Sequence, residues 1–92
     1  MHLIFRILGL DMPELSRAEE AVRRLARHYG FDAEVSKVNE VLELGRMGVL
    51  DALPALEING IIVSKGAPLT EEMVSSILKR LAVFSSEGTA AK

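Results

Sequence analysis

The residues best placed for chemistry lie in residues 9–16, where a predicted strand gives way to a predicted helix. Asp11 and Glu14 form a carboxylate pair that could act as an acid and a base, and Ser16 carries a hydroxyl that could act as a nucleophile. A simpler interpretation is that the two carboxylates cap the helix and that Ser16 is an ordinary first-turn serine, because no histidine base is evident beside it. We favour the simpler interpretation in both cases.

Cysteine is absent from the whole chain, which removes thiolate nucleophiles, thiolate metal ligands and disulfides. The two histidines, His2 and His28, do not form a pair at metal-ligand spacing, and we interpret them as solvated surface residues. Scattered methionines are typical of core filling and not of a soft-metal site. We therefore predict no metal and no other cofactor.

Hydrophobic periodicity predicts the elements that position these groups. Residues 3–8 form an apolar run typical of a strand buried on both faces, with Arg6 as the exception. An amphipathic helix follows and ends at Gly30, which we predict as its left-handed cap. Residues 31–38 alternate apolar and polar side chains, as a strand at a sheet edge does. Asn39 can then cap a short helix whose apolar residues are Val41, Leu42 and Leu44.

The second half of the chain predicts a hairpin and a final helix. Asn59 and Gly60 lie between two apolar runs, residues 54–58 and 61–63, and both turn positions of such a hairpin favour positive φ. Thr70 is the predicted cap of the last helix, whose first turn carries two glutamates. The predicted order is therefore β-α-β-α-β-β-α. It indicates an α/β fold with a mixed four-stranded sheet, helices on both faces and a parallel, right-handed connection between the first two strands.

Length and composition limit the classes of function. A chain of 92 residues makes one domain, which we place at residues 1–84, and residues 85–92 have little to bury and should form a flexible C-terminal tail. The formal net charge is −2 with both signs interspersed. The chain therefore has no basic patch, and we predict that it does not bind nucleic acid. No segment approaches the length of a membrane span and residues 2–8 are too short for a signal peptide, so we expect a cytoplasmic protein without membrane contact.

The order of elements and two motifs together resemble the thioredoxin fold, and more narrowly the small thioredoxin-like proteins called redox-active disulfide proteins. That family has a Gly-x-x-Cys-Pro-x-Cys turn after its first strand and a later Gly-Val-x-x-Thr-Pro-Ala-Leu-x-x-x-Gly stretch. Residues 9–15 are similar to the turn, and residues 48–60 are similar to the later stretch with one extra residue before the proline. The resemblance extends over roughly residues 2–82 and implies a thioredoxin-like fold in which Pro54 is the family's cis-proline.

The resemblance fails at the residues that carry the family's chemistry. Met12 and Leu15 occupy the positions of the two cysteines, and Leu53 replaces the threonine often found before the proline. Thiol–disulfide exchange needs a thiolate, which neither a thioether nor an alkyl side chain can supply. Disulfide oxidoreductase activity is therefore excluded for this chain acting alone, and we predict a degenerate, redox-inactive member.

With thiol chemistry excluded, the feature of the family that this chain can still use is a binding surface. It implies that Met12, Pro13, Leu15, Leu53 and Pro54 lie together at the former active-site end of the sheet. In thioredoxin-like proteins the backbone beside the cis-proline pairs with extended substrate segments, and such pairing does not require cysteine. The leading hypothesis is therefore a module that binds a protein or peptide partner, or a second copy of itself as a homodimer, through this end or through a sheet edge.

Two alternatives stay open. One is an enzyme or small-molecule binder that reuses the same end, for instance a transferase acting on a thiol compound, and it requires a concave pocket with convergent polar groups beside Met12 and Pro54. The other is a structural subunit whose only role is assembly. A measurement of mass in solution separates a monomer from this last possibility.

Overall fold

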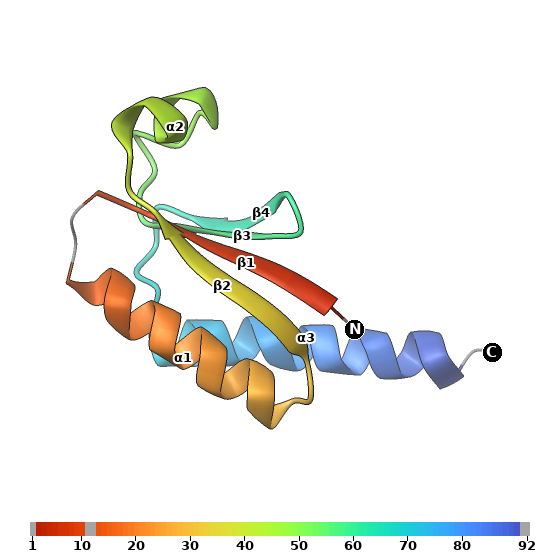
Figure 1. Ribbon diagram of the computed structural model, residues 1–92. Helices are drawn as coiled ribbons and strands as arrows, with labels where there is room; N and C mark the ends of the chain where they lie inside the picture. The colour runs from red at the N-terminus through yellow and green to blue at the C-terminus, as the bar shows by residue number, and fades with distance from the viewer. Residues whose placement is uncertain (1, 11–12, 91–92) are drawn as a thin grey trace.

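The structure is a computed structural model that describes residues 2–10 and 13–90, with side chains described as far as Val83. Its elements follow the predicted order (Figure 1) and are β1 (His2–Leu8), α1 (Glu14–His28), β2 (Asp32–Val38), α2 (Val41–Arg46), β3 (Ala55–Ile58), β4 (Ile61–Lys65) and α3 (Glu71–Ala90). The strands are ordered β2-β1-β3-β4 in one sheet, with β1 and β2 parallel and the other pairs antiparallel. The predicted mixed four-stranded sheet is confirmed.

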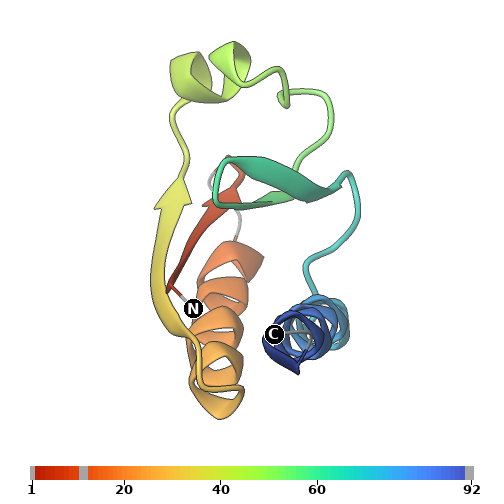
Figure 2. The ribbon, with the colours of Figure 1, turned by 90° about the vertical axis from the view of Figure 1, so that its right-hand side faces the viewer.

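Helices cover the two faces of the sheet unequally. Figures 1 and 2 show α1 and α3 on one face, whereas α2 lies at one end of the other face. The larger core lies beneath α1 and α3, where Phe5 and Ile7 of β1 and Leu56 of β3 are buried. A smaller core lies beneath α2, around Leu8 and Leu44. Alternation along β1 explains the division, because successive side chains of a strand point to opposite faces.

Local sequence explains where the two long helices begin and end. The buried residues that recur at helical spacing along α1 are Leu15, Ala18, Val22 and Ala26. After α1 the chain passes through Gly30 at a φ of 77°, which confirms the predicted left-handed cap. Before α3, the Thr70 hydroxyl accepts a hydrogen bond from the Met73 backbone N–H at 3.2 Å, so the predicted N-cap is also confirmed.

The hairpin and the sheet edges also follow the predicted pattern. Asn59 and Gly60 have φ values of 50° and 85°, and Ile58 pairs with Ile61 across this two-residue turn. The strand β2 lies at an edge of the sheet, as its alternation of exposed and partly buried side chains predicts. The strand β4 forms the opposite edge.

Helix α2 differs from the prediction in its cap and in what it buries. Its N-cap is Glu40 and not Asn39, and no side-chain hydrogen bond caps it. Leu44 is its buried residue, whereas Val41 is 55% exposed and Leu42 is 76% exposed. A six-residue helix has fewer than two turns, so it can present only a narrow face to the sheet.

Helix α3 is longer than the prediction. The expected tail begins at residue 85, but the helix continues to Ala90. Residues 85–90 contain no proline, and adding a residue to an existing helix is much easier than starting one, so the helix anchored by Val74 and Leu78 extends past the core. The flexibility of residues 85–92 stays a prediction.

The sheet face opposite α1 and α3 carries an ion pair between Arg6 of β1 and Glu57 of β3. The two residues are directly opposite in the register. The guanidinium donates two hydrogen bonds to the carboxylate, from Nε to Oε1 at 2.5 Å and from Nη2 to Oε2 at 2.9 Å. Hydrogen bonding to Glu57 raises the pKa of the Arg6 guanidinium above its ordinary value. Arg6, the single charged residue in the apolar run of residues 3–8, is therefore paired with a carboxylate.

Candidate functional site

The candidate site lies where β1 leads toward α1. Gly9 joins this end to the sheet, because its backbone N–H donates a hydrogen bond to the Val38 carbonyl of β2 at 3.1 Å. A Cβ atom on Gly9 would lie 2.8 Å from Cδ2 of Leu15, so the absence of a side chain lets the first turn of α1 pack close to the strand. Pro13 is the N-cap residue of α1 and offers no side-chain cap. Glycine and proline thus set the geometry of the turn.

The loop before β3 forms the other half of the site. The peptide bond between Leu53 and Pro54 is cis. The Gly66 backbone N–H holds the loop, donating to the carbonyl of Ala52 at 2.7 Å and to that of Pro54 at 3.1 Å. In contrast, the backbone N–H and C=O of Leu53 form no hydrogen bond with another described residue. Backbone groups without a hydrogen bond to the described residues can bond to an extended segment of another chain.

The five residues predicted at this end differ in accessibility. Pro13 is exposed and Leu53 is partly exposed, whereas Pro54 is buried. Leu15 is only 4% exposed and belongs to the larger core, so its side chain is not available to a partner. Met12 lies outside the described residues. Of the predicted side chains within the described part, Pro13 and Leu53 are those that reach the surface.

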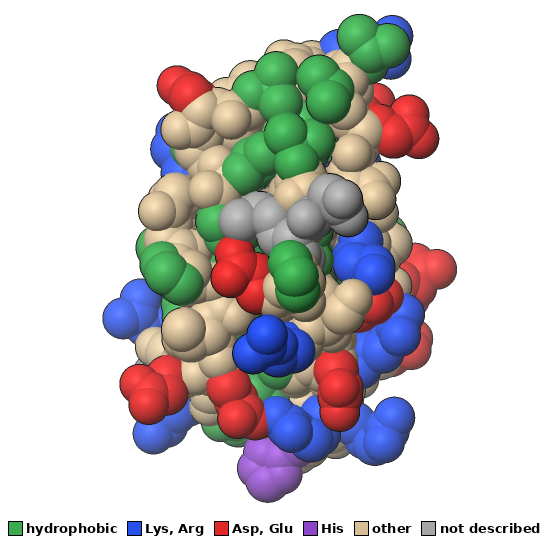
Figure 3. All heavy atoms as spheres, turned by 90° about the vertical axis from the view of Figure 1, so that its left-hand side faces the viewer, with side chains coloured by type: hydrophobic (Ala, Val, Ile, Leu, Met, Phe, Trp, Pro, Cys, Tyr) green, Lys and Arg blue, Asp and Glu red, His purple; other side chains and the backbone are tan. Residues whose placement is uncertain are grey.

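Sequence reasoning missed more exposed apolar side chains near this end. Figure 3 shows hydrophobic side chains gathered over α2. Together with Leu53, we call the following exposed residues the apolar end: Leu10, Val41, Leu42 and Leu50. For Val41 and Leu42 one signal was available in the sequence, since two adjacent apolar residues at the start of a very short helix cannot both face the sheet.

Ser16 is not set up as a nucleophile. The Lys37 ammonium donates a hydrogen bond to the Ser16 Oγ at 3.2 Å and lies 3.9 Å from the Glu19 carboxylate. An ammonium group that is paired with a carboxylate and donates to a hydroxyl does not take the proton from that hydroxyl. Asp11 lies outside the described residues. Because Pro13 is the N-cap of α1 and Glu14 is its first helical residue, with no side-chain cap, the prediction that Asp11 and Glu14 cap this helix as a pair is wrong.

Three cavities lined by described residues lie elsewhere. One of about 320 Å³ is bounded by residues 47–49 and 62–65, and another of about 490 Å³ lies along the charged face of α1. The third, of about 470 Å³, lies between α3 and the β3–β4 hairpin. Leu53 and Pro54 line none of these three cavities. The three cavities therefore do not support the hypothesis of an enzyme that reuses the candidate site.

Among the described residues there is neither a metal-binding cluster nor a membrane-spanning helix. No group of three or more His, Asp or Glu side chains in residues 2–10 and 13–83 is arranged to hold a metal ion. Within the described helices, none is both long and apolar enough to cross a membrane.

Comparison with protein families agrees with this geometry. A sequence profile described as "Thioredoxin domain" matches residues 5–79, from β1 into α3. The chain belongs to this thioredoxin family. The comparison with curated proteins gave no match. The predicted family and fold are therefore confirmed, and the matched region contains both the turn after β1 and the loop before β3.

As a thioredoxin domain, this protein keeps the framework of the family and lacks the reactive groups. The framework comprises the four-stranded sheet, the helix α1 that follows β1 and the cis peptide bond before Pro54. The reactive groups would be thiols, and the chain has no cysteine. This thioredoxin domain cannot by itself carry out thiol–disulfide exchange.

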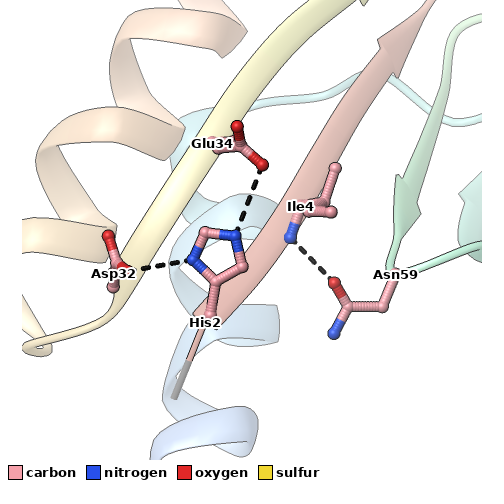
Figure 4. Close-up of polar contacts among 5 residues, drawn as sticks. All are labelled: His2, Ile4, Asp32, Glu34 and Asn59. Carbon is pink, nitrogen blue, oxygen red and sulfur yellow. Dashed lines mark hydrogen bonds and ion pairs between the residues drawn. The ribbon is translucent and has the colours of Figure 1, made fainter.

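At the opposite end of the sheet, His2 of β1 contacts two carboxylates of β2 (Figure 4). Its Nδ1 lies 2.9 Å from Oδ2 of Asp32, and its Nε2 lies 3.3 Å from Oε2 of Glu34. Both hydrogen bonds raise the pKa of His2 above its ordinary value of 6.5, and the bond with Asp32 has the larger effect. The predicted surface histidine is thus exposed, but it is not isolated.

We expect an NMR titration of the His2 ring to give a higher pKa in the parent protein than in an Asp32→Asn variant. Folding favours the protonated ring, so its stabilising contribution is fully present below about pH 6.5 and is lost as the pH rises through the higher folded-state pKa. Glu20→Gln on α1 serves as a control and should leave the titration unchanged. Equal pKa values in the parent and the Asp32→Asn variant would contradict the role of the carboxylate.

Proposed function

We propose that this thioredoxin domain is a redox-inactive binding module that holds an extended, apolar segment of a protein or peptide beside Leu53 and Pro54. The observation that carries the proposal is the backbone of Leu53, whose N–H and C=O have no hydrogen-bond partner among the described residues. An extended partner supplies those bonds by strand-like pairing. Each bond that is gained contributes about 1 kcal/mol net.

The apolar end supports a partner with apolar side chains. Leu42 is 76% exposed and Leu50 is 44% exposed, which is costly in water for side chains of this size. Full burial of one leucine contributes roughly 1.5–3 kcal/mol, so two or three such contacts next to the paired backbone are enough for a specific complex. The framework of the family is thus reused for binding without a thiol.

A second copy of the chain is the competing occupant of the apolar end. Exposed apolar surface on a small domain favours self-association as well as binding to another protein. Light scattering at two protein concentrations, repeated with Leu53→Asp, separates the two cases. A dimer that this substitution dissolves assigns the end to self-assembly, whereas a monomer leaves the end free for a peptide.

We expect peptides selected from a random library on the parent protein to be apolar, and Leu42→Asp to weaken their binding by about tenfold or more. The substitution places a carboxylate in the apolar end, but Leu42 is too exposed for the change to disturb the core. Calorimetric titration measures the affinity, and NMR should show one of the largest shifts at the Leu53 backbone N–H. Leu53→Asp should have the same effect on affinity.

The matched control is Ile61→Asp, since Ile61 is 67% exposed and lies in the hairpin at the other end of the sheet. Thermal unfolding of each variant checks that the domain is folded. Equal binding by the parent and Leu42→Asp, or a loss confined to Ile61→Asp, would show that the binding surface is elsewhere.

A further inference from the structure

A groove is lined by residues of α3, of the β3–β4 hairpin and of the start of β1, at the other end of β3 from Pro54. Figure 1 shows how these elements are arranged. Its volume of about 470 Å³ falls in the range of small-molecule sites, which is roughly 300–1,000 Å³. Four elements, β1, β3, β4 and α3, supply its apolar lining residues, which are Leu3, Ile58, Ile61, Val63, Ile77 and Leu81.

The apolar lining is not fully used in the folded domain. Leu3 and Ile58 are buried and form part of the larger core. Ile61 and Val63 of β4, in contrast, are 67% and 44% exposed. An alkyl group in the groove would lie against Leu3 and Ile58 and would cover the exposed side chains of β4. This contact removes apolar surface of both the ligand and the protein from water.

The two other described lining residues are hydrogen-bond donors. Arg80 of α3 is exposed and forms no ion pair with a described side chain. The Asn59 side chain accepts a hydrogen bond from the Ile4 backbone N–H at 2.8 Å through Oδ1 (Figure 4). This bond identifies the oxygen and leaves the Asn59 side-chain NH₂ group as a donor. The described lining therefore offers one full positive charge and one neutral donor, and no carboxylate.

We propose that this groove binds a monocarboxylic acid with an unbranched alkyl chain. The alkyl chain packs on the apolar lining, and the carboxylate accepts charge-assisted hydrogen bonds from the Arg80 guanidinium. A cationic amphiphile of the same length meets Arg80 with like charge, and an alcohol of the same length gains only the apolar contact. The charge of the groove thus selects the acid. This site is separate from the apolar end and does not depend on the proposed peptide binding.

The test is an NMR and calorimetric titration of the full chain with octanoate, octylamine and 1-octanol, all at concentrations where they do not form micelles. We expect octanoate to bind most tightly and to shift the amide signals of Ile61, Val63 and Leu81. Across hexanoate, octanoate and decanoate, each methylene that enters the groove should tighten binding by up to about fourfold. Arg80→Gln should weaken octanoate binding by about tenfold and leave 1-octanol binding unchanged.

Lys79→Gln is the matched control, because Lys79 is an exposed cation next to Arg80 on α3 that does not line the groove. It should bind octanoate as the parent does. The proposal is overturned by equal binding of the acid and the amine, by equal losses in the two variants, or by shifts confined to residues 50–54. It is also overturned if light scattering shows that a second copy covers the groove and octanoate does not bind.

Discussion

Replacing Arg6 with methionine is expected to lower the free energy of unfolding by about 2–3 kcal/mol. Methionine keeps much of the apolar packing of the long side chain, but the Glu57 carboxylate, which is 7% exposed, loses its two hydrogen bonds from the guanidinium. Loss of one partner from a fully buried pair costs about 3–5 kcal/mol. The expected loss is smaller here because the Arg6 side chain is 33% exposed and water can partly replace it. Urea unfolding measures the change.

Two further variants make this result specific to the buried carboxylate. Adding Glu57→Met to the Arg6 variant should recover most of the loss, because no charge then stays buried without a partner. Arg24→Met removes the ion pair with Glu71 between α1 and α3, in which both side chains are more than half exposed, and should change stability by less than about 1 kcal/mol. A loss as large for Arg24→Met as for Arg6→Met would contradict the argument.

A Leu44→Ala substitution is expected to cost about 2–4 kcal/mol of stability. Leu44 is fully buried and packs in the smaller core with Leu8, Val49 and Ala55. The alanine leaves a cavity between α2 and the sheet and removes the main apolar anchor of this short helix. Denaturant unfolding measures the loss, and hydrogen exchange of the α2 amides should rise more than that of the α1 amides.

Leu42→Ala on the same helix is the matched control. Leu42 is 76% exposed, so its truncation should change stability by less than about 0.5 kcal/mol. The two variants remove the same atoms from the same residue type two positions apart, so only burial separates them. Similar stability in both variants would show that α2 is not held to the sheet by Leu44.

These two positions also connect stability to the proposed function. Val41 and Leu42 belong to the apolar end, and α2 carries them. If Leu44→Ala loosens α2, peptide binding should weaken even though the Leu44 side chain is buried and does not reach a partner. The effect on binding would then arise from disorder of the surface and not from a lost contact.

Features that depend on neighbouring residues were predictable from the sequence. The alternation in β2, the positive φ values at Asn59 and Gly60 and the cap at Thr70 all follow from patterns a few residues long. Two motifs in the right order then predicted the family, which the profile match over residues 5–79 confirms. The exclusion of thiol chemistry needed only composition, because the chain has no cysteine.

Local patterns failed where they were too short to choose between alternatives. In α2, six residues are not enough for periodicity to show that Leu44 faces the sheet while Leu42 faces solvent. The same shortness explains why Asn39 was predicted as the cap although the structure places Glu40 there. At the other end, residues 85–90 have little apolar pattern, yet α3 continues through them because it is already formed.

The sequence by itself determined the element types, the family and the absence of thiol chemistry, because each depends on residue identity and short-range spacing. Only the tertiary structure decided which residues meet. Arg6 pairs with Glu57 across 51 positions, Leu15 is taken into the core, and Leu3 joins Leu81 in one groove. Such long-range contacts depend on sheet register and helix placement. These are set by the combined burial of many side chains and not by the spacing of a few residues.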